Sequence, residues 1–389
     1  TGEFGNNLRE VDARGRTLDE KISSEPKVGN NLYTSLDLKS HQAAHKAFNN
    51  RKGAVVAIDI KDGSIVTLFS SPTFPTNQLA NGILQKDFDE LLLSEEKPFF
   101  NRALKGRYPP ASSIKPAIAM YGIEEGLIDW DFSIFDEGFF TLPEDGRIYR
   151  DWKEGGHGDT NLFKAITQSS NTYFFDLAYR SDINQLNKHL SSLGFGGKAC
   201  IDCFEEDKVF VPEPSWKMNK HNFGWFKGDT VNMGVGQGYL VSTPIQLAKY
   251  AYIMANKGKF SDLSLKKDLV KSEKSIEFNK FSNDDWFKLH ESMVNVIEGN
   301  TGTARRLRER KNYIVAAKTG TAELVSGDNR EQYSETRLDD SLRDHALIIA
   351  FGPMPNPRYA VSVVVENGES GGSVAGPVAI SVLNSLIQE

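Results

Sequence analysis

The order of the expected elements indicates an α+β protein with an antiparallel sheet flanked by helices. Two β-branched runs, Gly53–Ile60 and Ser64–Phe69, surround Asp62-Gly63, a dipeptide typical of a type I′ hairpin turn. A long, mostly helical stretch follows, and three more apolar runs of strand length lie towards the C-terminus. Strands from both ends of the chain would then share one sheet, and this segregation of helices from strands is typical of α+β folds.

The other elements follow from local periodicity, caps and chain breakers. Residues 1–30 are polar and are predicted to form an irregular arm, whereas residues 72–110 indicate a long surface excursion and residues 123–160 a loop with short elements. Helix starts are marked by capping residues, as at Asp37 and Asn283. Strands are expected at Asn31–Leu38, Tyr313–Ala317, Ala346–Phe351 and Tyr359–Val365, and helices at Asp37–Phe48, Ser113–Gly122, Thr160–Ser169, Thr172–Tyr179, Ile183–Leu193, Thr243–Asn256, Asn283–Ile297 and Val374–Ile387.

The composition is ordinary for a soluble globular protein. The 389 residues are 39% hydrophobic and 25% charged, and the net charge is −6. Since no basic stripe dominates, a nucleic-acid partner is not expected. No apolar run approaches the ~18–20 residues that a membrane-spanning helix needs.

A serine and a lysine three positions apart open the helix predicted after Pro109-Pro110. In Ser112-Ser-Ile-Lys115 the two side chains would lie on one helix face. A serine hydroxyl becomes a useful nucleophile when a neighbouring base takes its proton, and a lysine can be that base if burial or a nearby cation lowers its pKa. The tetrad alone is weak evidence, because it also describes a helix cap followed by a surface lysine.

Two further motifs follow in order and strengthen this interpretation. Ser169-Ser-Asn171 lies at a break between two predicted helices, and Lys318-Thr319-Gly320-Thr321 is expected at the end of an apolar strand. A lysine and threonine on a strand edge can hold a carboxylate, and Gly320 lacks a side chain that would obstruct a ligand. The combination of Ser-x-x-Lys, Ser-x-Asn and Lys-Thr-Gly is the signature of penicillin-binding proteins and class A β-lactamases.

Two other segments resemble functional motifs but are not assigned to the site. Thr301-Gly302-Thr303-Ala304 also contains Thr-Gly-Thr, but Asn300 replaces the lysine and no strand precedes it, so a turn after the preceding helix is expected. Gly234-Val-Gly-Gln-Gly238 lacks the βαβ context of a dinucleotide-binding loop.

The chain from about residue 30 to residue 389 resembles the class B penicillin-binding proteins. Tyr108-Pro-Pro-Ala-Ser-Ser-Ile-Lys-Pro116 is similar to their nucleophile segment, and Arg150-Asp-Trp-Lys-Glu-Gly-Gly-His-Gly158 resembles the elongation-specific penicillin-binding protein 2 type. Further similar segments are Gly228-Asp-Thr230, Gly234–Gly238, Thr243-Pro244, Val364-Val-Glu-Asn-Gly368 and Gly371-Gly372. The resemblance implies a penicilloyl-serine transferase fold, with a sheet of about five strands and a mostly helical subdomain. The transpeptidase domain would be residues 51–389, and residues 1–50 would be what remains of an N-terminal pedestal.

The resemblance also implies a DD-transpeptidase that cross-links peptidoglycan stem peptides during cell elongation. Ser112 would attack the D-Ala–D-Ala carbonyl, Lys115 would take its proton, and Ser169 with Lys318 would relay a proton to the leaving D-alanine. Asn171 would orient the substrate amide. The acyl group would pass to the amine of a second stem peptide, and β-lactams would acylate the same serine.

The remaining implied features concern substrate binding and location. Thr319 and Thr321 would bind the terminal carboxylate, and the backbone N–H groups of Ser112 and Thr321 would form the oxyanion hole. A single N-terminal helix, absent from this sequence, would anchor the protein in the inner membrane with the catalytic domain in the periplasm. The expected partners are a membrane glycosyltransferase and shape-determining scaffold proteins of the elongation machinery.

A metal site is considered at Asp136, Asp151 and His157, since carboxylates and imidazole are suitable zinc ligands. Some members of the elongation branch carry zinc here, with a cysteine at the middle position of the Ser-x-Asn motif, where this chain has Ser170. A hydroxyl is a poor zinc ligand, so the alternative is that the carboxylates cap turns and His157 packs in the loop. The reaction itself requires no cofactor.

Several alternatives stay open on the sequence alone. A β-lactamase or a DD-carboxypeptidase would share the acylation step and use water as acceptor, and a sensor would be acylated only to signal. A division-specific class B enzyme is a further alternative, although the segment from Asp151 to His157 favours elongation. Cys200 and Cys203 fit half a zinc site, a redox pair or two cysteines without a joint role.

Overall fold

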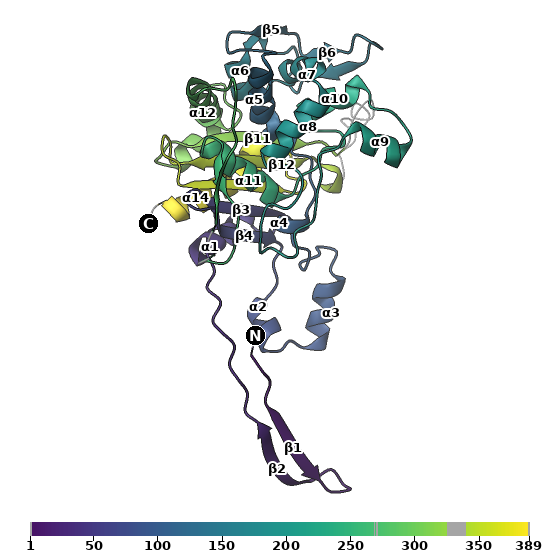
Figure 1. Cartoon of the computed structure of the whole chain (residues 1–389), viewed down its shortest axis with the longest axis vertical. Helices are drawn as coiled ribbons and strands as arrows, with labels where there is room; N and C mark the ends of the chain where they lie inside the picture. Colours follow the sequence, from purple (N-terminus) through teal and green to yellow (C-terminus); the bar gives the residue numbers. More distant parts are fainter. Residues whose placement is uncertain (1, 268, 270, 325–339, 388–389) are drawn as a thin grey trace.

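The computed structural model describes residues 2–387 except 268, 270 and 325–339, and it is built on one five-stranded antiparallel sheet (Figure 1). The strand order is β11-β12-β13-β3-β4, so the first strands of the domain pair with the last. This confirms the predicted α+β architecture. The strands are β3 (Gly53–Asp59), β4 (Ser64–Ser71), β11 (Ala316–Ala322), β12 (His345–Gly352) and β13 (Tyr359–Val365).

Each face of the sheet has its own hydrophobic core because side chains alternate along a strand. On β3, Ala54, Val56 and Ile58 point into the larger core, and Val55 and Ala57 point into the smaller one. The smaller core is covered by α1 (Leu38–Phe48) and α14 (Gly376–Ile387), which pack against each other. On the other face, α11 (Pro244–Ala255) packs on β3, β12 and β13.

A mostly helical subdomain lies beyond α11 at the upper end of the molecule in Figure 1. The apolar helix α5 is its centre, and residues from Lys115 to Ile123 of this helix are all buried. Its helices are α5 (Lys115–Glu125), α6 (Leu162–Gln168), α7 (Asn171–Arg180), α8 (Ile183–Ser192), α10 (Lys227–Gly234) and α12 (Asn283–Glu298). Two small strand pairs complete it: β5 (Ser133–Asp136) with β8 (Gly158–Asn161), and β6 (Phe139–Thr141) with β7 (Ile148–Arg150).

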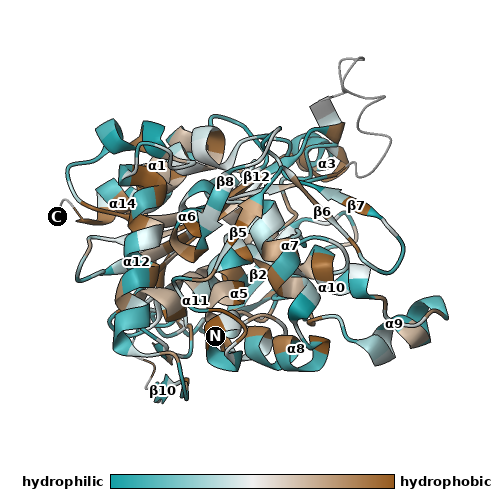
Figure 2. Cartoon of the chain, turned by 90° about the horizontal axis from the view of Figure 1, so that it is seen from above, coloured by the Kyte–Doolittle hydropathy of each residue, from teal (hydrophilic) through white to brown (hydrophobic). Residues whose placement is uncertain are grey.

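The excursion expected at residues 72–110 is helical in part. It contains α2 (Thr76–Asn81), α3 (Gln85–Leu93) and α4 (Arg102–Lys105). Further along the chain, α9 (Pro214–His221) projects from the side of the body (Figures 1 and 2), and β9 (Lys259–Ser261) pairs with β10 (Glu273–Ser275). Within the described part of the chain, no helix combines the length and apolarity needed to cross a bilayer.

The N-terminal arm is more regular than predicted. Residues 6–24 form an exposed hairpin of β1 (Asn6–Val11) and β2 (Thr17–Ser24), which extends away from the body in Figure 1. Asp12 accepts two backbone hydrogen bonds in its turn, and Arg9 pairs with Glu20 across it. Because neither face of the hairpin is buried, no alternation of apolar residues marks it in the sequence. The predicted strand at residues 31–38 is wrong, since Thr34 makes only an isolated bridge.

Three local predictions also differ from the structure. The β3–β4 connection is a four-residue turn in which Gly63 has φ of 73° and Asp62 is not left-handed, so the turn is not type I′. The cap of α12 is Ser282, whose hydroxyl accepts from the Asp285 N–H. Strand β11 continues to Ala322, so the Lys-Thr-Gly motif lies inside the strand and not at its end.

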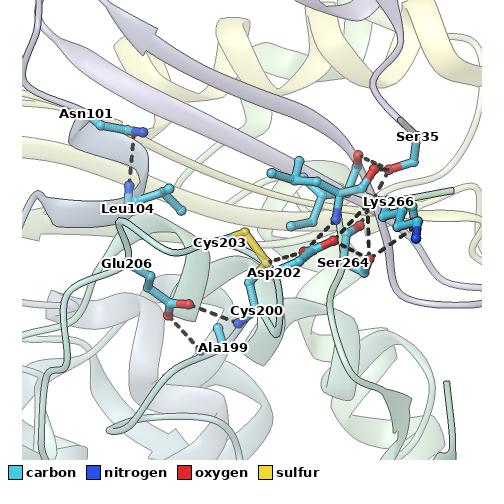
Figure 3. Close-up of a disulfide and its surroundings, with 12 residues drawn as sticks. Ser35, Asn101, Leu104, Ala199, Cys200, Asp202, Cys203, Glu206, Ser264 and Lys266 are labelled. Atoms are coloured by element: carbon cyan, nitrogen blue, oxygen red, sulfur yellow. Dashed lines mark hydrogen bonds between the residues drawn. A yellow bond between two sulfur atoms is a disulfide. The ribbon is translucent and has the colours of Figure 1, made fainter. Parts of the chain in front are cut away.

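Cys200 and Cys203 form a disulfide in a compact loop (Figure 3). The carboxylate of Asp202, between them, accepts hydrogen bonds from the segment 264–266, with distances of 2.8–2.9 Å to the Ser264 hydroxyl and to backbone N–H groups. Glu206 accepts from the backbone N–H groups of Ala199 and Cys200 at 2.6 and 3.0 Å. Of the alternatives considered for the cysteines, the structure therefore supports a bonded pair and leaves no thiolate for a zinc site.

Candidate active site

The predicted nucleophile lies on a tight turn at the start of α5. Ser112 belongs to a 3₁₀ turn, Ala111–Ile114, that leads directly into the helix. Ala111 has a left-handed backbone with φ of 48°, and its N–H donates to the carbonyl of Gly236 at 2.9 Å. A Cβ on Gly236 would lie 2.2 Å from the Ala111 oxygen, so this glycine lets the 234–238 loop hold the turn directly.

Lys115 is completely buried beneath this turn and faces the Ser-x-Asn motif. Its Nζ donates to the Ser169 carbonyl at 2.8 Å and to the Asn171 Oδ1 at 2.7 Å, with the Ser169 hydroxyl at 3.3 Å. Burial lowers the pKa of Lys115 to about 7, against the opposing attraction of Asp151 and Asp136. A substantial fraction of this lysine is therefore a neutral amine near neutral pH and can accept a proton.

Lys318 approaches the same serine from the sheet. Its Nζ donates to the Ser169 hydroxyl at 2.8 Å, and its side chain is also completely buried. Burial, and then repulsion by Lys115, lowers the pKa of Lys318 well below its ordinary value. Ser169 has a left-handed backbone with φ of 61° between α6 and α7, which turns its hydroxyl towards both lysines. The three predicted motifs thus meet at one point.

Gly320 lies where β11 packs against the nucleophile turn. A Cβ at this position would lie 3.1 Å from the Pro110 oxygen and 3.3 Å from the Ser113 nitrogen. The absence of a side chain therefore lets β11 pack closely against the nucleophile turn. Thr321, next along the edge strand, accepts a hydrogen bond from the Gln237 side chain through its carbonyl at 3.3 Å.

The acidic cluster lies directly behind the Ser-x-Asn turn. Asp136 Oδ2 is 2.8 Å from the Nδ1 of His157 and 2.7 Å from the Ser170 hydroxyl, and these partners hold the pKa of Asp136 well below its ordinary value against the effect of burial. Asp151 accepts from the N–H groups of Asn171 and Thr172 at 2.6 and 2.9 Å. The carboxylate of Asp151 therefore orients the start of α7.

Three of these side chains also converge in the manner of metal ligands. One ligand atom from each of Asp136, Asp151 and His157 lies within 4.8 Å of the other two. The ring nitrogen of His157 that faces the two carboxylates is Nδ1, at 2.8 Å from Asp136 and 3.8 Å from Asp151, and the other ring nitrogen, Nε2, is buried without a partner among the described residues. The set fits three corners of a zinc site. The Ser170 hydroxyl, at the position where the family resemblance implies a fourth ligand, already donates to Asp136.

Sequence reasoning missed two contacts at the site. The indole N–H of Trp152 donates to the Ser169 carbonyl at 3.1 Å and so shares this acceptor with Lys115. The hydroxyl of Thr303 lies 2.6 Å from that of Thr319. Trp152 falls within a segment that carries the family resemblance, but Thr303 belongs to a segment that the sequence assigned only to a turn.

The chain is similar to penicillin-binding proteins in family, sequence and structure. The penicillin binding protein transpeptidase domain matches residues 53–384. The peptidoglycan D,D-transpeptidase MrdA of Acinetobacter baumannii is 39% identical over 375 residues, which cover 94% of this chain. The chain spans 55% of the length of that relative.

Two solved structures share the fold. Pseudomonas aeruginosa PBP2 in complex with WCK 5153 has a TM-score of 0.84 and 35% identity, covering 94% of this chain and 80% of its own. PBP2 from Helicobacter pylori, in its complex with MreC, has a TM-score of 0.84 and 30% identity, covering 100% of this chain and 69% of its own. The family match includes all three motifs and all five strands of the sheet. The chain therefore belongs to the penicillin binding protein transpeptidase family.

Proposed function

We propose that this chain carries the catalytic domain, residues 51–389, of a peptidoglycan DD-transpeptidase that cross-links stem peptides during cell elongation. The observation that carries the proposal is the meeting of Lys115, Ser169, Asn171 and Lys318 beside the Ser112 turn. The similarity to MrdA of A. baumannii supports the elongation branch. Residues 1–50 would then be what remains of the pedestal, although α1 packs on the body of the domain.

The first step is acylation of Ser112. Its hydroxyl oxygen attacks the carbonyl of the penultimate D-alanine while the neutral amine of Lys115 takes the hydroxyl proton. The lowered pKa of Lys115 supports this role, because an ordinary lysine would be protonated and could not act as a base. Asn171, whose Oδ1 accepts from Lys115, would hold both this lysine and the substrate amide.

The developing oxyanion is stabilised by backbone N–H groups of Ser112 and Thr321. In a strand, the N–H and C=O of one residue point to the same side, and the Thr321 carbonyl faces Gln237 and not β12. The Thr321 N–H therefore also points out of the sheet edge. Such preorganised donors contribute roughly 10²–10³-fold to acyl-transfer rates.

Collapse of the tetrahedral intermediate breaks the peptide bond and releases D-alanine. The leaving nitrogen takes a proton from the Ser169 hydroxyl, which Lys318 and Lys115 replenish because both contact it. The amine of a second stem peptide then attacks the ester, forms the cross-link and returns a proton to Ser112. Thr319 and Thr321 bind the terminal carboxylate of the donor peptide at the edge of β11.

The proposal is tested by the intact mass of the protein after mixing with a penicillin, with Ser112→Ala as control. A stable adduct in the wild type alone is expected, because a β-lactam acylates the serine and blocks the acceptor. Consumption of the penicillin without an adduct would indicate a β-lactamase, and neither adduct nor consumption would contradict the proposed site. Product analysis with stem peptides then separates cross-linking from carboxypeptidase activity and from a sensor that only becomes acylated.

The partners and the location follow from the same family relationship. The structure of H. pylori PBP2 with MreC supports a shape-determining scaffold partner. A membrane glycosyltransferase that polymerises the glycan is the second partner we propose. The full protein would be anchored in the inner membrane by an N-terminal helix, with this domain in the periplasm, and the disulfide is consistent with an oxidising compartment.

A structural zinc ion at Asp136, Asp151 and His157 is a separate proposal, and the reaction does not require it. Bound there, the ion would stabilise the turn that carries Ser169 and Asn171, since Asp151 already holds the start of α7. Elemental analysis of the metal-replete protein tests this proposal against a His157→Ala variant. About one zinc per chain, lost in the variant, is expected, and a wild type without zinc would end the proposal.

A further inference from the structure

The segment Thr301-Gly302-Thr303 lies beside the proposed carboxylate-binding strand. It follows α12 in a tight turn, and the N–H of Ala304 donates to the Val296 carbonyl at 2.9 Å. Through this turn the Thr303 hydroxyl comes within 2.6 Å of the Thr319 hydroxyl on β11. The contact joins residues that are 16 positions apart and belong to different elements.

Glycines on both sides hold this contact in place. A Cβ on Gly302 would lie 2.3 Å from the carbonyl oxygens of Asn295 and Val296, and one on Gly372 would lie 2.5 Å from the Thr303 oxygen. A Cβ on Gly371 would lie 2.6 Å from the Gly320 oxygen. The Thr303 backbone is thus packed between the end of α12 and the 371–372 turn, which itself rests on β11. These close approaches leave little room for Thr303 to move away from Thr319.

The number of protons available determines which of the two hydroxyls donates in the Thr303–Thr319 hydrogen bond when a substrate is bound. Each hydroxyl has one proton, and an ionised carboxylate only accepts hydrogen bonds. If Thr319 donates its proton to the substrate carboxylate, the 2.6 Å contact persists only when Thr303 is the donor and Thr319 the acceptor. Such a chain of hydrogen bonds also polarises the Thr319 hydroxyl and strengthens its hydrogen bond to the carboxylate.

We propose that Thr303 is a positioning residue for the terminal carboxylate of the donor peptide, acting through the Thr319 hydroxyl. Thr303 does not touch the carboxylate. It donates to Thr319 and so directs the Thr319 proton towards the ligand, which favours acyl donors with a free carboxylate. This inference rests on the proposed function, because it assigns a third hydroxyl to the same binding site.

The test compares the second-order acylation rate constant for a penicillin with that for its methyl ester, which lacks the anionic carboxylate. Thr303→Val keeps the shape and removes the hydroxyl, Thr303→Ser restores it, and Thr301→Val is a matched control on an exposed threonine of the same turn. We expect Thr303→Val to lower the rate for the free acid about 3- to 10-fold, the range for one neutral hydrogen bond. The ester rate, the Thr303→Ser rates and the Thr301→Val rates should stay close to those of the wild type.

A double-mutant cycle with Thr319→Val completes the test. Because Thr303 acts through Thr319, the double variant should be acylated no more slowly than Thr319→Val alone. Additive losses, or an equal loss for acid and ester in Thr303→Val, would overturn the inference. A wild type that is not acylated by either compound would instead refute the proposed function, so the two failures are distinguishable.

Discussion

Gly236 supports the nucleophile turn, and Gly236→Ala is expected to slow acylation in a protein that still folds. The new Cβ would lie 2.2 Å from the Ala111 oxygen and 2.7 Å from its nitrogen. An ordinary contact starts at 3.4 Å, so the two segments must separate by about 1.2 Å, the difference between 3.4 and 2.2 Å. Ala111 immediately precedes Ser112, and the displacement would therefore reach the reactive hydroxyl.

The magnitude follows from two separate effects. A non-glycine residue at φ of 72° costs about 1–2 kcal/mol of folding free energy, and stretching the Ala111–Gly236 hydrogen bond costs about 1 kcal/mol more. A reacting group displaced by about 1 Å loses on the order of 10²-fold in rate. We therefore expect acylation about 100-fold slower in a protein that still folds.

Gly146→Ala is the matched control. Gly146 has φ of 73°, and a Cβ there meets nothing within 4 Å. Gly146→Ala therefore has the same backbone conformational cost as Gly236→Ala, but its new Cβ clashes with no neighbouring atom. Acylation is measured by intact mass over time, and stability by denaturant unfolding of the same preparations. Equal acylation rates in the two variants would refute the view that the 234–238 loop positions Ser112.

Three further predictions concern the proton acceptor, a buried ion pair and the disulfide. The acylation rate should rise with pH through about 7, since Lys115 is an ammonium below its pKa and a neutral base above it; a profile flat across neutrality would contradict its role. Arg102→Met should lower the free energy of unfolding by about 3 kcal/mol, because the carboxylate of Glu366 stays largely buried without its 3.0 Å partner. A loss of unfolding free energy as small as that for an exposed ion pair would contradict this reasoning. Replacing Cys200 and Cys203 by serine should cost about 2 kcal/mol in denaturant unfolding, the loop-closure value for so short a loop, and should leave acylation unchanged. Slower acylation would show that the disulfide also supports the site.

The central sheet and the motifs could be predicted because their signals are local. The alternation of Ala54, Val56 and Ile58 with Val55 and Ala57 reflects burial on both faces of β3, and the β-branched runs near the C-terminus are buried in the same sheet. The residue types in Ser-x-x-Lys, Ser-x-Asn and Lys-Thr-Gly express the requirements of acyl transfer, which can be read without coordinates.

The N-terminal hairpin and the cap of α12 could not be predicted as well. Exposed strands carry no alternation, and two adjacent capping residues, Ser282 and Asn283, are chemically equivalent candidates. In both places the sequence offers no local preference strong enough to decide.

Tertiary structure alone decided which side chains meet. Lys115, Ser169 and Lys318 are separated by 54 and 149 positions in the chain and share hydrogen bonds only after the sheet and the helical subdomain pack together. The contact between Thr303 and Thr319, and the packing of Gly320 on the nucleophile turn, likewise depend on close approach of separate segments. A sequence pattern records which face of an element is buried, whereas contacts of a few ångströms between distant elements depend on how those faces pack.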